Sequence, residues 1–323
     1  MRASRRWCAL LFAAALCASA AASRARETRQ ESKKEEKKEK SSAPPVAVRL
    51  GALVLDAQEK PVNDLRAEDF QILEDGVPQK VTVFEHLEGP PAYGLLVDNS
   101  GSIRNNIGRI VDFGKLVVGG TGENSAGFVV RFVGSNEIKI MQDTTTDKRA
   151  LFSALDDMFI EGGQTAINDA VYLGAERVAQ FRRLEKIPRR YSLVLVTDGE
   201  DRASFYKNEQ VYAKLRETGV RVFVIGLIQK EYNATTPEGA KRYMRRLAFE
   251  SGGAVYFWKR GDELAPVAAH LLADMNANYL VGYESTNAKR DGSTRAVAVS
   301  VTPAPDGTPR KVFAQDGYEA PKK

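Results

Sequence analysis

The sequence predicts an α/β protein whose doubly wound, mostly parallel sheet is inserted into a small β-sandwich. Between residues 93 and 277, strand and helix patterns alternate, which is typical of a parallel sheet with helices on both faces. The flanking segments, 46–90 and 278–318, show only strand patterns separated by turns. Because neither flank is long enough to bury much surface alone, we expect the two to pair as one sandwich built from N- and C-terminal strands.

The first 45 residues predict export. Residues 1–6 are basic, residues 7–18 form an apolar run too short to span a bilayer, and small residues follow as far as Ala22. This pattern predicts a signal peptide over 1–22, with an uncleaved anchor as the alternative. Residues 23–45 repeat Glu and Lys and contain no large apolar residue that could pack, which predicts a disordered linker. We therefore expect a bacterial protein that is periplasmic or secreted to the cell surface, with no stable membrane span after cleavage.

Charge and cysteine content exclude several function classes. The formal net charge is +5, but part of it lies in the signal peptide, so the mature chain is close to neutral and predicts no nucleic-acid partner. Both cysteines, Cys8 and Cys17, also lie in that segment. The mature protein is therefore expected to have no disulfide, thiol nucleophile or thiolate metal site.

The two flanks predict short strands. The N-terminal flank predicts a strand over 46–56 and a hairpin over 70–84 with Asp75 and Gly76 at its turn. The C-terminal flank predicts strands over 279–284, 295–301 and 311–314, with a tail over 319–323.

The central domain, over 91–277, predicts alternating elements. Strands are expected at 94–97, 127–133, 138–142, 192–197, 220–226 and 254–258. Helices are expected at 103–118, 147–158, 166–181, 208–218, 237–250 and 262–277, and Asp147 and Asp262 are expected to be N-caps.

Oxygen-bearing side chains follow one of the predicted buried strands. Residues 94–97 are apolar without alternation, as in a strand buried on both faces, and they lead into Asp98, Ser100 and Ser102. In open α/β sheets, ligands bind outside the carboxyl ends of the strands. Oxygen-only donors suit a hard cation, so this loop predicts Mg²⁺ or Mn²⁺.

Two further segments predict that the site has more ligands. Thr165 stands at a predicted loop-to-helix junction, and Asp198 follows another buried strand. Their order and spacing fit three neighbouring strand ends that converge on one point.

At these residues the chain resembles the von Willebrand factor type A (VWA) family, whose Rossmann-like domain carries a metal-ion-dependent adhesion site. More closely, it is similar to the bacterial VWFA-related domain proteins first recognised in acidobacteria, over about residues 46–318. The resemblance implies that Ser100 and Ser102 coordinate the cation directly and Thr165 directly or through water. It implies that Asp98 and Asp198 act mainly through ordered waters. The remaining ligand would be an Asp or Glu carboxylate of a partner protein.

Neighbouring polar residues form a possible second shell: Asn99, Asp169 and Glu200. Asn99 occupies a position that is not a ligand in the family. Asp169 could reach the metal or could charge the first turn of its helix. Glu200 could select ligands or lie in a solvated loop.

The predicted function is metal-dependent binding or adhesion through a carboxylate. Two alternatives stay open, namely a scaffold subunit of an envelope complex with the metal optional, and a metal-dependent hydrolase. The sequence favours a non-enzyme because it has no phosphate-binding lysine loop and no Gly-x-Ser-x-Gly elbow. Its two histidines, His86 and His270, lie in strand and helix patterns typical of packing or surface residues.

Overall fold

The computed structural model describes residues 45–199, 201–227, 237–259 and 261–322. The predicted signal peptide, all of the predicted linker except Pro45, and Glu200 lie outside the described residues. No helix within the described part is long and apolar enough to cross a membrane.

The central sheet has the predicted doubly wound, mostly parallel arrangement. Its order is β10 (Val255–Trp258), β9 (Arg221–Leu227), β8 (Arg190–Thr197), β5 (Pro91–Asp98), β6 (Ala126–Phe132) and β7 (Ile138–Thr145). Neighbouring strands are parallel except for the edge strand β7, which is antiparallel to β6. This arrangement confirms the predicted fold class.

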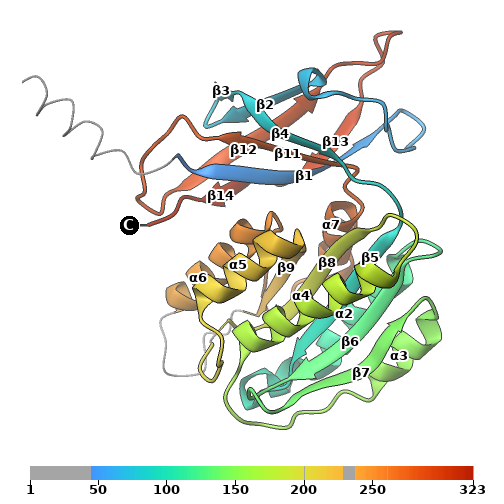
Figure 1. Ribbon diagram of the computed structural model, residues 1–323, viewed down its shortest axis with the longest axis vertical. Coiled ribbons are helices and arrows are strands. Elements are labelled where there is room, and N and C mark those ends of the chain that lie inside the picture. The colour runs from blue at the N-terminus through green and yellow to red at the C-terminus, as the bar shows by residue number, and fades with distance from the viewer. Residues whose placement is uncertain (1–44, 200, 228–236, 260, 323) are drawn as a thin grey trace, which may run out of the picture. The chain divides into compact units, whose positions relative to one another are not determined.

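Helices cover both faces of this sheet (Figure 1). One face packs α2 (Ile107–Gly120), α3 (Lys148–Asp156) and α7 (Leu264–Met275); the other packs α4 (Ile167–Leu184), α5 (Asn208–Thr218) and α6 (Pro237–Ser251). Strand β5 shows why its sequence has no alternation. Leu96 belongs to the core under α4, whereas Leu95 and Val97 belong to the core under α2. Both faces are therefore apolar.

The predicted helix starts have mixed outcomes. Asp147 is the N-cap of α3 as expected, and its Oδ1 accepts the backbone N–H of Arg149 at 2.9 Å. The prediction for Asp262 is wrong: α7 begins at Leu264, and the Asp262 carboxylate instead accepts the backbone N–H of Lys259 at 2.8 Å. Because this hydrogen bond closes the preceding loop, the Asp262 carboxylate does not cap the helix. The helix expected from residue 103 opens as a 3₁₀ segment, η2 (Gly101–Asn106).

Strands from the two ends of the chain interleave in the sandwich. One sheet has the order β13 (Lys311–Ala314), β1 (Ala47–Leu55), β11 (Tyr279–Glu284) and β4 (Val81–His86). The other has the order β14 (Gly317–Glu319), β12 (Thr294–Val301), β2 (Phe70–Glu74) and β3 (Val77–Gln79), and η1 (Ala67–Asp69) precedes β2. In Figure 1 the blue N-terminal strands lie beside the red C-terminal ones. The predicted pairing of the two flanks is confirmed.

The predicted hairpin over 70–84 is correct only in its first half. β2 and β3 pair around Asp75 and Gly76, which both have positive φ, as a type I′ turn requires. The chain then changes sheet, because β4 pairs with β11 rather than with β3. Alternation of apolar residues indicates which face of a strand is buried but not which sheet the strand joins. Strand β14 was not predicted.

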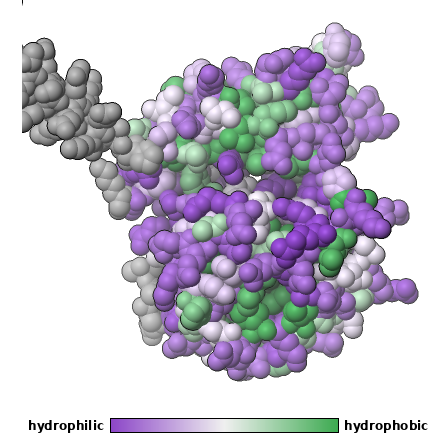
Figure 2. Space-filling view, viewed as in Figure 1, coloured by the Kyte–Doolittle hydropathy of each residue, from purple (hydrophilic) through white to green (hydrophobic). Residues whose placement is uncertain are grey.

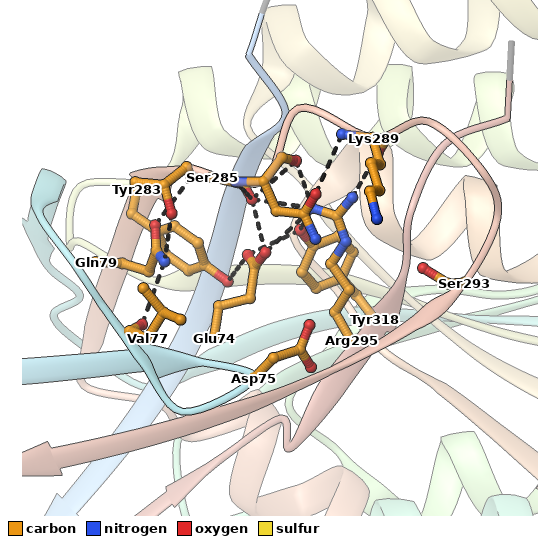
Figure 3. A network of polar contacts seen from close by, with 12 residues as sticks. Glu74, Asp75, Val77, Gln79, Tyr283, Ser285, Lys289, Ser293, Arg295 and Tyr318 are labelled. Atoms are coloured by element: carbon orange, nitrogen blue, oxygen red, sulfur yellow. Dashed lines mark hydrogen bonds and ion pairs between the residues drawn. The ribbon is translucent and has the colours of Figure 1, made fainter.

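A buried polar network joins the two halves of the sandwich (Figure 3). Glu74 and Arg295 are 2% and 0% exposed, and Arg295 Nη1 lies 3.1 Å from Glu74 Oε1. Ser285 Oγ donates to the same oxygen at 2.7 Å, and the hydroxyls of Tyr283 and Tyr318 donate to Oε2 at 2.8 and 2.9 Å. Arg295 also donates to the carbonyls of residues 287 and 289. The Glu74 carboxylate is thus held by residues from the C-terminal flank.

The surface seen in Figure 2 is mostly hydrophilic. Hydrophobic atoms gather in places among the polar ones, including a cluster in the lower part of the view. A largely polar exterior agrees with the high content of charged residues, 28%.

Close packing between β5 and β6 gives a first testable prediction. A Cβ added to Gly94 would lie 2.2 Å from Cζ of Phe128. We expect Gly94→Ala to lower the free energy of unfolding by about 1–3 kcal/mol through overpacking. Chemical denaturation measures this loss, and adding Phe128→Leu should recover much of it. Gly108→Ala in α2 is the matched control, because no atom lies within 4 Å of its added Cβ. An equal loss in both single variants would contradict the packing argument.

Candidate metal centre

The candidate metal ligands lie at the carboxyl edge of the central sheet. The chain order reverses at β5, whose neighbours are β8 and β6, so this strand is the topological switch point where open α/β sheets bind ligands. Asp98 is the last residue of β5, and Asp198 follows the last residue of β8. Thr165 lies just before α4.

The Asp98 loop is tightly ordered by its own hydrogen bonds. Asp98 Oδ1 accepts the backbone N–H of Ser100 at 2.9 Å, and Ser100 Oγ lies 2.9 Å from Ser102 Oγ. Asp98 and Ser100 are 0% and 2% exposed. The two hydroxyl oxygens therefore lie next to each other, on the loop that follows the buried Asp98.

The site is electrostatically suited to a cation. Burial and the charge of nearby Asp198 together raise the pKa of Asp98 to about 7, although the hydrogen bonds from Ser100 and Thr197 oppose the shift. The buried Asp98 carboxylate and the nearby Asp198 repel each other when both are ionised. A divalent cation would relieve that repulsion and favour the ionised form of Asp98.

Backbone hydrogen bonds tie the Thr165 loop to its neighbours. The Asn99 carbonyl accepts the N–H groups of Glu161 and Gly162 at 3.2 and 3.4 Å. The Thr165 carbonyl accepts the N–H groups of Arg202 and Ala203 at 2.8 and 3.1 Å. Thr165 is 5% exposed. The structure thus joins the three loops that carry the predicted ligands.

Two of the three residues predicted as a possible second shell, Asp169 and Asn99, hydrogen-bond to the backbone of neighbouring loops. Both carboxylate oxygens of Asp169 accept backbone N–H groups, from Phe205 and Tyr206, at 2.9 and 2.8 Å. The Asn99 side-chain amide donates to the carbonyl of Phe159. Glu200 lies outside the described residues. Asp169 and Asn99 therefore hold the loops that surround the site.

Sequence reasoning missed Thr197, the last residue of β8. Its hydroxyl donates to Asp98 Oδ2 at 2.7 Å and accepts the N–H of Gly199 at 3.1 Å. Thr197 thus orients the second oxygen of Asp98 and shapes the turn after Asp198. Its position immediately before that acid was the signal in the sequence.

The donor set fits Mg²⁺ or Mn²⁺. In the described part of the chain, no group of three or more His, Cys, Asp or Glu side chains could hold a metal ion. The predicted site instead combines three hydroxyl oxygens with two carboxylates. Neighbouring ligands of an octahedral ion with bonds of 2.0–2.1 Å lie about 3 Å apart. The separation of Ser100 Oγ and Ser102 Oγ, 2.9 Å, matches that spacing. Ser100, Ser102 and Thr165 would hold the ion, with Asp98 and Asp198 binding its waters.

The fold and site together define an open-sheet α/β domain with a hydroxyl–carboxylate centre at its switch point. The model of the von Willebrand factor type A domain family matches residues 94–267, more than half of the chain. This protein belongs to the VWA family.

Solved structures with a similar fold include bacterial and animal proteins. An aerotolerance-related membrane protein from Bacteroides fragilis is 17% identical and covers 58% of this chain and 98% of its own, with a TM-score of 0.45. A von Willebrand factor type A protein from Catenulispora acidiphila is 11% identical, with a TM-score of 0.48. The match covers 88% of this chain and 75% of that protein. A third structure is that of proximal thread matrix protein 1 from the mussel byssus, in which zinc occupies the metal-ion-dependent adhesion site. It is 24% identical, with a TM-score of 0.46, and the match covers 58% of this chain and 48% of that protein.

Proposed function

We propose that this protein binds a partner protein by capturing an Asp or Glu carboxylate on a divalent cation, Mg²⁺ or Mn²⁺. The observation that carries the proposal is the paired hydroxyls of Ser100 and Ser102 beside the buried Asp98. When the direct ligands are neutral hydroxyls, the cation keeps most of its charge and attracts an anionic ligand. We also propose that the protein acts outside the cytoplasm, as the pattern of residues 1–22 predicts.

A binding role suits the state of Asp98. Both of its oxygens already accept hydrogen bonds within the protein, from Ser100 and Thr197. These hydrogen bonds fix the orientation of the carboxylate and leave acceptor capacity on each oxygen for a metal-bound water.

Two exposed aromatic side chains lie on the loops around the site. Phe159 is 51% exposed and lies under the guanidinium of Arg131, 4.4 Å from its ring centroid. Phe205 is 75% exposed, and its backbone is fixed by Asp169. Aromatic side chains are enriched at protein–protein interfaces because they bury a large apolar area when a partner binds. We propose that the captured carboxylate is flanked by apolar residues.

A peptide-display selection tests this function. Random peptides bound to the immobilised protein in Mg²⁺ and released by chelator should be enriched in Asp or Glu next to apolar residues. The Ser100→Ala, Ser102→Ala double variant should retain none of these peptides. Peptides without carboxylates, or peptides that stay bound in chelator, would contradict metal-bridged capture.

The role of the aromatic side chains has its own test. Repeating the selection with Phe205→Ser should keep the requirement for Asp or Glu but lose the apolar neighbour, because only the flanking contact is removed. Phe313→Ser is the matched control, since Phe313 is also exposed (43%) but lies on β13 of the sandwich. An unchanged peptide preference in Phe205→Ser would contradict the proposed contact.

A further inference from the structure

We infer that a second binding site, lined with arginine, takes a small ligand that carries phosphoryl groups. The site is a cavity of about 490 Å³. It lies away from the metal centre, because Arg190 and Arg221 in its wall are the first residues of β8 and β9, whereas Asp98 and Asp198 are at the opposite ends of β5 and β8.

Positive charge predominates in the wall of this cavity. Seven of its lining side chains are basic and three are acidic. Two of the acids are already paired, Glu185 with Arg189 and Glu250 with Arg216, each at 2.8 Å. In the described parts of the chain, no carboxylate lies within 4.0 Å of the guanidinium groups of Arg182, Arg190 and Arg221. These three arginines leave an excess of positive charge for a ligand to neutralise.

The surplus guanidinium groups are held in place by neutral partners. Arg182 lies over the ring of Tyr191, 4.1 Å from its centroid, and donates to the carbonyl of Thr218 at 2.7 Å. Arg190 donates through Nε to the carbonyl of Leu87 at 3.3 Å. These contacts fix the two groups without cancelling their charge, which preorganises them for an anion.

Arg221 makes the excess charge costly in the absence of a ligand. It is 5% exposed and donates to the carbonyls of Asp274 and Met275 at 2.9 and 3.4 Å. Burial lowers the pKa of Arg221 to about 10. The charge of Arg190 acts in the same direction, whereas the nearby charge of Asp274 opposes the shift without cancelling it. An anion placed between these arginines would offset both effects.

Phosphoryl groups fit the size and charge of this cavity best. Its volume lies within the range of about 300–1,000 Å³ that small-molecule sites occupy. A guanidinium group donates two parallel hydrogen bonds to phosphate oxygens. Each phosphoryl group brings a charge of about −1.5 to −2 at neutral pH, so one or two of them match several arginines in a small space. The cavity also has walls from both domains, including Arg49 of β1 and Glu85 of β4.

Calorimetric titration with inorganic pyrophosphate tests the site. The buffer should be passed over a chelating resin and contain no added divalent cation, so the metal centre contributes nothing and its failure would leave this result intact. We expect saturable binding to the full chain. Arg190→Gln and Arg182→Gln should each weaken pyrophosphate binding by about tenfold. Arg190→Lys keeps the charge but loses the planar guanidinium group, so its affinity should fall between those of wild type and Arg190→Gln.

Arg183→Gln is the matched control, because Arg183 follows Arg182 on α4 and is also exposed but does not line this cavity. It should bind pyrophosphate as wild type does. Melting temperatures without ligand confirm that each variant is folded. The inference is overturned if wild type shows no saturable binding at millimolar pyrophosphate, if Arg183→Gln loses as much affinity as Arg182→Gln, or if a hexaglutamate peptide binds more tightly than pyrophosphate.

Discussion

Replacing Ser100 and Ser102 together with alanine should weaken Mn²⁺ binding by about a hundredfold or more. Both hydroxyls are proposed as direct ligands, and even changes to groups that only support metal ligands cost about 10–100-fold in affinity. We expect the fold to survive, because alanine at position 100 keeps the backbone N–H that Asp98 Oδ1 accepts at 2.9 Å. Titration of metal-free protein with Mn²⁺, followed calorimetrically, measures the change.

The control for this experiment is Ser153→Ala with Ser300→Ala. Both serines are exposed, on α3 and β12, and neither is among the predicted ligands. This pair should bind Mn²⁺ as wild type does. Wild-type affinity in the Ser100, Ser102 variant would show that the cation, if bound, uses other ligands.

The largest expected effect on stability comes from Arg295→Met. Arg295 is the cationic partner of Glu74 inside the sandwich, and both side chains are at most 2% exposed. Removing it leaves a buried carboxylate without its counter-charge, which costs about 3–5 kcal/mol. The free energy of unfolding, from urea denaturation, should fall by that amount. Adding Glu74→Gln should recover part of the loss, because the remaining amide is neutral and its oxygen still accepts from Tyr283 or Ser285.

An exposed ion pair supplies the comparison for Arg295. Lys311 Nζ lies 2.8 Å from Glu59 Oε1, but both side chains are more than half exposed. Lys311→Met should leave stability close to that of wild type, because solvent screens such pairs. If Arg295→Met is as mild as Lys311→Met, or if Glu74→Gln worsens it, the buried network does not hold the two halves of the sandwich together.

The sequence predicted the central domain and the position of the site because both follow from local patterns. Uninterrupted apolar runs such as residues 94–97 mark strands buried on both faces, and the structure places Leu95 and Leu96 in opposite cores. Asp98 and Asp198 are within one residue of their strand ends. Once the strands are parallel neighbours, their polar ends must meet at one edge. The ligand roles of these residues remain predictions until a metal is measured.

Long-range contacts could not be predicted in the same way. The hydrogen bonds from the backbone N–H groups of Phe205 and Tyr206 to the Asp169 carboxylate join residues that are 36 and 37 positions apart. In the sandwich, Glu74 shares the buried face of β2 with Phe70 and Ile72. A charged residue at an inward position of a strand indicates that a buried partner exists. Only the pairing of β2 with β12 shows that this partner is Arg295.

Anomalous diffraction at the manganese edge, from crystals of the protein grown with Mn²⁺, tests the central claim most directly. We predict one strong peak within direct-ligand distance, about 2.0–2.3 Å, of both Ser100 Oγ and Ser102 Oγ. The same peak should be absent from crystals of the Ser100→Ala, Ser102→Ala variant. A wild-type map with no peak beside these hydroxyls, or with its strongest peak at another group of acidic residues, would contradict the proposed metal centre.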